Sequence, residues 1–197
     1  RVFQEVEDVS PDGSVLAYAG RQGGTRGMLF VRPLDSLTAQ PLAGTEGASY
    51  PTWSPDGRQL AFFADRKLKK VPANGGTVQS ICEAEDGRGA TWGAGNVIVF
   101  APRPMGGLSM VSASGGSPEP ITTAASEGVT HRNPHFLQDG GRLLFFSGNT
   151  AADRAGGIHS LDLSTKKVEL VLSVDSEGIY IEPGYLAFVR QGNLMVQ

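Results

Sequence analysis

The feature that most constrains the fold is an apolar segment that recurs roughly every 43 residues. The segments LAYA, LAFF, VIVF, LLFF and LAFV start at Leu16, Leu60, Val97, Leu143 and Leu186. These starts lie 44, 37, 46 and 43 residues apart. A fixed period near 40 residues is the sequence signature of a repeat architecture. We therefore expect one structural unit to be built several times along the chain.

Turn signals precede these apolar segments. SPDG occurs at Ser10 and Ser54, and the shorter signals WGAGN at Trp92, LQDGG at Leu137 and EPG at Glu182 take its place in later copies. Proline suits the second position of a type I turn, aspartate hydrogen-bonds to nearby amides, and glycine closes the turn. The residues that we assign to turns on this basis are Pro11, Asp12, Gly13, Pro55, Asp56, Gly57 and Asp139.

Two further strands are predicted after each apolar segment. Alternating segments such as MLFVRPL at Met28 and LSMVSA at Leu108 are typical of half-buried strands, and short segments such as VQSIC and VELVL follow the next turn. A fourth strand ends at the apolar or aromatic residue before the turn, as at Trp53, Trp92 and Phe136, which we expect to pack between units. Four strands in about 40 residues form one blade of a β-propeller.

The predicted fold is therefore all-β, a propeller of four-stranded antiparallel blades with four complete repeats and part of a fifth. The repeats span residues 9–52, 53–91, 92–135 and 136–183, with a partial repeat at 184–197. A β-sandwich also has many short strands, but it gives no reason for the whole four-strand pattern to recur. We expect an open or truncated arc, whose unpaired blade edge favours self-association. Val2 and Phe3 offer an alternative, a closed five-bladed ring in which they complete the last blade.

Several sequence segments resemble those of a known family. WSPDG before an LAF-type strand, together with VSASGGSPEPITT, resembles the TolB-like, WD-repeat-like propellers of bacteria. The longer segments YPTWSPDGRQLAFFADRKLKKVPANGG and GYLAFVRQGNLMVQ resemble the propeller that follows the kinase domain and membrane helix in bacterial serine/threonine protein kinases. This resemblance covers nearly the whole chain. It implies a non-catalytic sensor region, because neither an HRD-type loop nor a DFG motif occurs here.

Composition and charge restrict the partners. The net charge is −3, with no long run of lysine or arginine, which argues against nucleic acid. No apolar run approaches the ~20 residues that a membrane-spanning helix requires. Cys82 is the single cysteine, so no internal disulfide forms, and we expect it to be a small core residue.

Catalytic and metal motifs receive little support. No GxSxG segment marks a hydrolase nucleophile. His131 and His135 are four residues apart, a spacing that also places two residues on one face of a strand, but Pro134 disfavours the helix on which such a pair usually binds zinc. Polar residues on an inner strand are the plainer interpretation. We expect no catalytic residue, no metal and no cofactor.

One regularity points to a binding surface. An acidic residue stands directly before glycine at four connections between repeats: Glu46, Asp86, Glu127 and Glu177. Such connections lie on one face of a propeller near its channel. One interpretation is turn chemistry, because a carboxylate satisfies amides in a bend. The other is a charged mouth that attracts a cation or a basic peptide. Arg88, His131, Arg132 and Tyr180 follow these connections and are the candidate specificity residues.

These observations predict a binding or sensing module whose partner is a protein, a peptide or a small ligand, in an extracytoplasmic or periplasmic location. The leading expectation is the sensor region of a receptor-like serine/threonine kinase. A TolB-like scaffold for protein assembly is the first alternative. A propeller-based hydrolase, or the non-catalytic domain of one, is the second.

Overall fold

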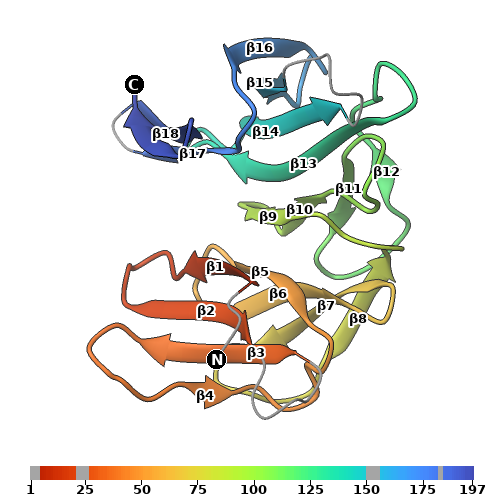
Figure 1. Ribbon diagram of the computed structural model, residues 1–197. Coiled ribbons are helices and arrows are strands. Elements are labelled where there is room, and N and C mark those ends of the chain that lie inside the picture. Colours follow the sequence, from red (N-terminus) through yellow and green to blue (C-terminus); the bar gives the residue numbers. More distant parts are fainter. Residues whose placement is uncertain (1–4, 21–26, 150–155, 182–183) are drawn as a thin grey trace.

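The computed structural model describes residues 5–20, 27–149, 156–181 and 184–197, and the expectations for Val2, Phe3 and Glu182 lie outside them. Among these residues there are strands and turns but no helix, so no helix there could span a membrane. The strands form five separate antiparallel sheets, four with four strands and the last with three (Figure 1). The predicted all-β fold of four complete units and part of a fifth is confirmed.

Each sheet is built from strands that follow one another in the sequence. The first sheet contains β1 (Glu5–Val9), β2 (Val15–Gly20), β3 (Met28–Pro33) and β4 (Gln40–Pro41). The second contains β5 (Ser49–Trp53), β6 (Gln59–Ala64), β7 (Lys67–Pro72) and β8 (Gln79–Glu83). The third contains β9 (Ala90–Gly93), β10 (Val97–Phe100), β11 (Ser109–Ser112) and β12 (Glu119–Pro120). The fourth contains β13 (Val129–Phe136), β14 (Arg142–Asn149), β15 (Gly157–Asp162) and β16 (Val168–Ser173). The fifth contains β17 (Gly178–Ile181), β18 (Tyr185–Arg190) and β19 (Asn193–Val196).

The sheets succeed one another around a common centre, from red through green to blue in Figure 1. The first strand of each sheet lies innermost, and β1 contacts β5, β5 contacts β9, and β9 contacts β13. This is the arrangement of propeller blades. Each sheet takes its innermost strand from the segment ahead of the turn, so the sheets are offset from the turn-to-turn repeats by one strand.

The core is divided into clusters between successive sheets. Alternate residues of β6 enter two of them: Leu60 and Phe62 face the first sheet, whereas Ala61 and Phe63 face the third. A central strand with both faces covered is apolar at every position, which explains the continuous runs in the sequence. Trp53 belongs to the first cluster, Trp92 to the second, and Phe136 packs against the third.

Hydrogen bonds also join neighbouring sheets at equivalent places. The amide of Trp53 donates to Oδ2 of Asp8 at 2.9 Å, and its indole Nε1 donates to the carbonyl of Asp8 at 3.1 Å. Between the third and fourth sheets, the amide of Phe136 donates to Oγ1 of Thr91 at 3.3 Å. In both cases a side-chain oxygen of one innermost strand accepts from the last residue of another, which fixes the angle between the sheets.

The innermost strands contain bulges that the sequence analysis did not foresee. Tyr50 and Asn133, each directly before a proline, have positive φ angles of 49° and 48° where the register of the pair slips. The slip in β13 places His135 on the same face as Arg132 and leaves His131 on the opposite face. The expectation that residues 131 and 135 share a face is therefore wrong, because a bulge inserts one extra residue and inverts the alternation.

Candidate binding surfaces

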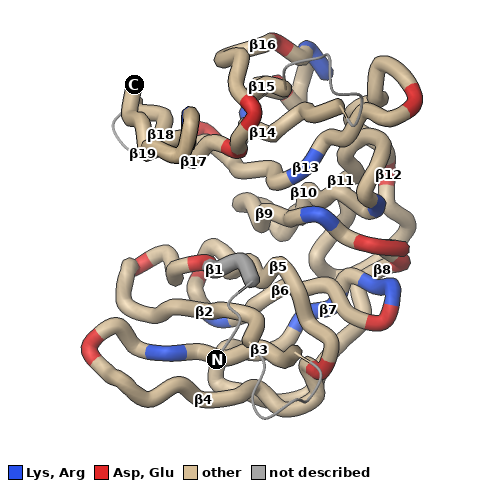
Figure 2. The backbone as a smooth tube through the Cα atoms, in the orientation of Figure 1, with Lys and Arg blue, Asp and Glu red and all other residues tan. Residues whose placement is uncertain are grey.

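Two faces of the propeller differ in their loops. The connections from one sheet to the next lie on one face, together with the hairpins between the second and third strands of each sheet; we call this the connection face. The SPDG turns and the hairpins between the third and fourth strands lie on the opposite face, the turn face. Lys, Arg, Asp and Glu are scattered over all the sheets (Figure 2), so recognition by charge must be local.

The four predicted carboxylates all lie on the connection face, and the structure gives them different surroundings. Glu46 accepts a long hydrogen bond of 3.4 Å from the amide of Gly44, the contact expected of turn chemistry. Glu127 is exposed. Asp86 accepts two hydrogen bonds of 2.7 Å from Arg88, and Oε1 of Glu177 lies 3.9 Å from Nε of Arg132. Two of the four carboxylates therefore orient arginines.

Three arginines line one recess of about 560 Å³ on the connection face: Arg88 from the connection between the second and third sheets, Arg132 from β13 and Arg190 from β18. The guanidinium of Arg132 lies over the ring of Phe146 at 5.0 Å, and that of Arg190 lies over Phe188 at 5.3 Å. Aromatic rings that support a guanidinium restrict its orientation and leave its donors at the edge available. Asp175 also lines the recess, so side chains of both positive and negative charge face it.

Two buried polar atoms of this recess have no hydrogen-bond partner in the described part of the chain, Oγ1 of Thr130 and Nε of Arg132. A buried donor or acceptor without a partner is uncommon and costs free energy. Thr130, Asp175 and Arg190 were not among the predicted site residues. Only the fold brings them beside Arg88 and Arg132, since no local motif marks them.

The other two candidate specificity residues pack between sheets. His131 is buried, with its ring 4.8 Å from that of Phe145 and Nδ1 at 2.8 Å from Oγ1 of Thr122. Burial lowers the pKa of His131 from its ordinary value of 6.5 to about 4. Tyr180 packs against the cluster between the fourth and fifth sheets. Neither side chain stands free beside Arg88 and Arg132.

A second recess, of about 480 Å³, lies in the central channel and takes residues from the innermost region of all five sheets. Asp8, Thr52, Thr91, His135 and Glu177 are among its polar lining residues. Burial raises the pKa of Asp8, against hydrogen bonds to Trp53, Thr52 and Val9 that lower it. The bulges at Tyr50 and Asn133 shape its wall.

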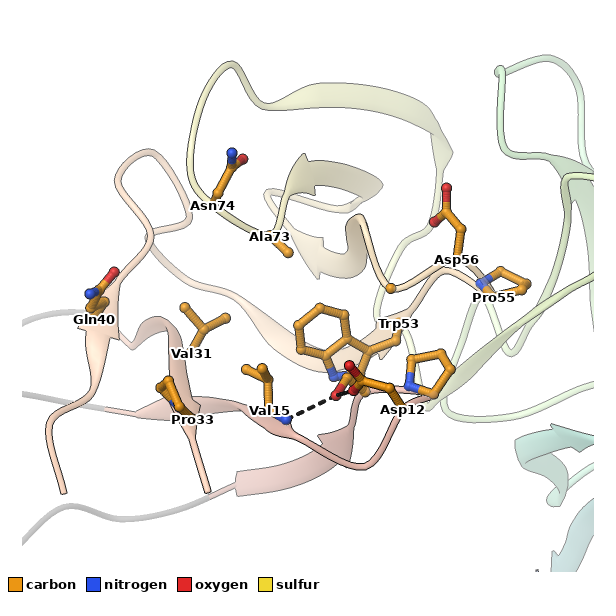
Figure 3. Close-up of a pocket in the computed structure, with 13 residues that line it drawn as sticks. Asp12, Val15, Val31, Pro33, Gln40, Trp53, Pro55, Asp56, Ala73 and Asn74 are labelled. Carbon is orange, nitrogen blue, oxygen red and sulfur yellow. Dashed lines mark hydrogen bonds between the residues drawn. The ribbon is translucent and has the colours of Figure 1, made fainter. Parts of the chain in front are cut away.

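On the turn face, a groove of about 610 Å³ separates the first two SPDG turns (Figure 3). Val15, Val31, Pro33, Trp53 and Ala73 give it apolar walls. In these turns Gly13 and Gly57 have φ angles of 73° and 68°, which favour glycine. Asp139 accepts amide hydrogen bonds from Gly141 and Arg142 in the same way.

Metal ligands and the one cysteine are the remaining candidate site residues. Within the described ranges no three His, Cys, Asp or Glu side chains lie close enough to hold a metal ion. Burial, assisted by the charge of Glu83, raises the pKa of the Cys82 thiol to about 11. Cys82 packs against the cluster between the second and third sheets and is therefore a thiol at neutral pH, as expected of a core residue.

Comparison with known proteins agrees with this architecture. The structure is similar to TolB from Acinetobacter baumannii, with a TM-score of 0.73 at 16% identity over 97% of this chain and 52% of that one. It is also similar to a putative TolB from Agrobacterium tumefaciens, with a TM-score of 0.70 at 18% identity over 83% of this chain and 63% of that one. At these identities the similarity defines the fold alone, a TolB-like β-propeller.

Sequence similarity extends to one curated relative of another kind. An uncharacterised peptidase of Bacillus subtilis, YuxL, is 28% identical over 163 residues, which are 77% of this chain and 23% of that protein. No family model matches the chain. The chain thus spans less than two thirds of the length of each of these proteins.

Proposed function

We propose that this propeller is a non-catalytic module that binds a protein or peptide through its connection face. The observation that carries the proposal is the recess that Arg88, Arg132 and Arg190 line together, one from a connection and two from the fourth and fifth sheets. Carboxylates at the sheet connections pair with two of these arginines, so the mouth offers charges of both signs in fixed positions. Such patterned charge favours selection of a partner by electrostatic complementarity.

The finer proposal is a sensor region of a receptor-like serine/threonine kinase, in an extracytoplasmic location. It rests on the resemblance of the longer sequence segments, and the kinase would belong to the parent protein. A TolB-like scaffold for protein assembly is the alternative that the fold comparison favours. The same connection face would serve either role.

A second candidate is the non-catalytic propeller of a peptidase, which the 28% identity to YuxL favours. In that case the connection face or the channel would select substrates for a catalytic domain elsewhere in the parent protein. The two proposals differ in the fate of a bound peptide in the parent protein, which is retained by a sensor and cleaved by a peptidase.

The proposal is tested by titrating the chain with three capped ten-residue probes, one rich in lysine, one rich in glutamate and one of serine and glycine. Isothermal titration calorimetry at low salt measures affinity, and mass spectrometry checks that the probes stay intact. We expect at least one charged probe to bind and to be recovered uncleaved, and the neutral probe not to bind.

Two variants assign that binding to the connection face. Replacing Glu46, Asp86, Glu127 and Glu177 together by alanine should weaken a basic probe at least tenfold, and Arg132→Gln with Arg190→Gln should weaken an acidic probe by a similar factor. Circular dichroism confirms folding. Unchanged affinities in both variants, cleavage of a probe, or equal binding of all three would overturn the proposal.

A further inference from the structure

The groove on the turn face combines an apolar wall with carboxylates of one sign. Its lining residues include Asp12 and Asp56 but no lysine, arginine or histidine. In Figure 3 the indole of Trp53 lies beside Asp12, with Val15 and Val31 on its other side and Gln40 and Asn74 at the far side of the groove. Asp56 lies on the second SPDG turn. The hydrogen bonds to Asp8 hold Trp53 in place, so this wall is already formed without a ligand.

Turn formation uses only one oxygen of each carboxylate. Oδ1 of Asp12 accepts from the hydroxyls of Ser10 and Ser14 at 2.6 and 2.7 Å and from the amide of Ser14 at 3.0 Å. Oδ1 of Asp56 likewise accepts from the hydroxyl of Ser54 at 2.6 Å and the amide of Arg58 at 3.1 Å. Within the described chain, the hydrogen bonds found leave both Oδ2 atoms unengaged.

Both carboxylates stay ionised over the physiological range. The hydrogen bonds from Ser10 and Ser14 lower the pKa of Asp12 to about 2. Those from Ser54 and Arg58 lower the pKa of Asp56, and the charge of Arg58 adds to the effect. Arg58 is exposed and does not line the groove. The negative charges of Asp12 and Asp56 are therefore not neutralised by another lining residue.

We propose that this groove binds a lysine or arginine side chain of a partner peptide, with its aliphatic stem against Val15, Val31 and Trp53 and its cationic head between Asp12 and Asp56. Charge complementarity selects this occupant. An anion would be repelled, and a purely apolar ligand would leave two carboxylates at its edge without a cation. Lysine and arginine alone combine a long apolar stem with a positive head. The inference concerns the face opposite the arginine recess and stands independently of the proposed function.

The test uses the capped tripeptide acetyl-Leu-Lys-Leu-amide and its counterpart in which the lysine is acetylated. The two probes share the stem and differ in the charge. Affinity is measured by isothermal titration calorimetry at low and at physiological salt. We expect the lysine probe to bind at least tenfold more tightly than the acetylated one, and its advantage to shrink with added salt.

Three variants locate the site. Asp12→Asn with Asp56→Asn keeps an acceptor at the Oδ1 position, so the turns are preserved while both charges are removed. We expect this variant to lose at least tenfold in affinity for the lysine probe. Gln40→Lys places a cation at the rim on the exposed strand β4 and should have a similar effect. Asp35→Asn, an exposed charge outside the groove, is the matched control and should bind normally.

Equal binding of the two probes, or unchanged affinity in both groove variants, would overturn the inference. The quadruple carboxylate variant of the connection face separates it from the proposed function. If the lysine probe responds to that variant and not to the groove variants, basic segments bind at the connection face alone. Urea unfolding of each variant verifies that lost binding reflects a lost charge and not a lost fold.

Discussion

Among single residues, His131 shows how burial decides a role: its place in the sequence suggested a binding residue, but in the structure it packs between sheets. Oγ1 of Thr122 accepts a hydrogen bond from the amide of Leu108 and lies 2.8 Å from Nδ1 of His131. Because its pKa is lowered to about 4, the imidazole is neutral at pH 7, and either the Thr122 hydroxyl or an Nδ1 hydrogen can donate in this contact. Phe145 lies between the rings of His131 and His159, and the charge of His159 adds to the lowering of the pKa.

This histidine should make stability depend on pH. Its pKa falls from 6.5 in the unfolded chain to about 4 in the fold. The stabilisation is therefore complete above pH 6.5 and is lost as the pH falls to about 4. The total loss is roughly 3 kcal/mol at most. Urea unfolding at pH 7.5, 5.5 and 4.5 should show a smaller loss in His131→Gln than in the natural protein. Parallel pH profiles would contradict this assignment.

Asp8 should behave in the opposite way. Burial raises its pKa, so the charged carboxylate destabilises the fold as the pH rises through that value. Asp8→Asn keeps an oxygen for the amide of Trp53 and removes the charge. We expect a small gain in unfolding free energy at pH 7 that disappears in acid, where the natural carboxyl is protonated. A loss of stability at pH 7 would show that the charge strengthens the bond to Trp53 by more than its burial costs.

At the scale of elements, close approaches between loops and strands set the fit of each sheet. Gly107 stands where a Cβ atom would overlap the carbonyl and the hydroxyl of Thr122. The same threonine connects Leu108 to His131, so one side chain joins the end of the third sheet to the start of the fourth. Glycine is required here for space, since its φ angle is not in the left-handed region.

Gly107→Ala should therefore destabilise the protein by about 1 to 3 kcal/mol, because the loop must move away from Thr122. Gly141→Ala is the matched control: its Cβ would meet no atom within 4 Å, and its φ angle is also ordinary. Chemical denaturation of both variants measures the difference. Equal free energies of unfolding would mean that the loop before Leu108 moves to accommodate the added methyl group without destabilising the fold.

At the scale of the whole molecule, the fifth sheet has one face unlike the faces of the other sheets. Its Phe188 packs towards the fourth sheet, but Ile179, Leu194 and Val196 on the opposite face are 62%, 72% and 57% exposed. In the sheets before it, the corresponding face is covered by the next sheet. Contiguous exposed apolar residues of this kind promote association.

We expect the chain to self-associate at micromolar concentration through this face. Ile179→Lys combined with Leu194→Lys should shift analytical ultracentrifugation profiles towards the monomer. Leu37→Lys is the control, since Leu37 is 99% exposed but lies on a hairpin of the first sheet. An unchanged distribution in the double variant, or an equal shift in the control, would place the contact elsewhere.

The sequence alone determined the repeat, the blade and the turn residues. Periodicity and turn chemistry depend on neighbours within a few positions, so SPDG and the LAFF-type runs identify hairpins and doubly covered strands without knowledge of the tertiary fold. The assignments of Trp53, Asp12 and Asp56 to packing and turns follow from the same local rules.

Which polar residues lie close together depends on the tertiary structure. The bulge at Asn133 separated His131 from His135, and the succession of sheets brought Arg190 beside Arg88 and Arg132, which are distant in sequence. The free oxygens of Asp12 and Asp56 became a candidate site because two turns, one blade apart, enclose the same groove. These relations depend on the angle between sheets and on contacts across the chain, which no local pattern encodes.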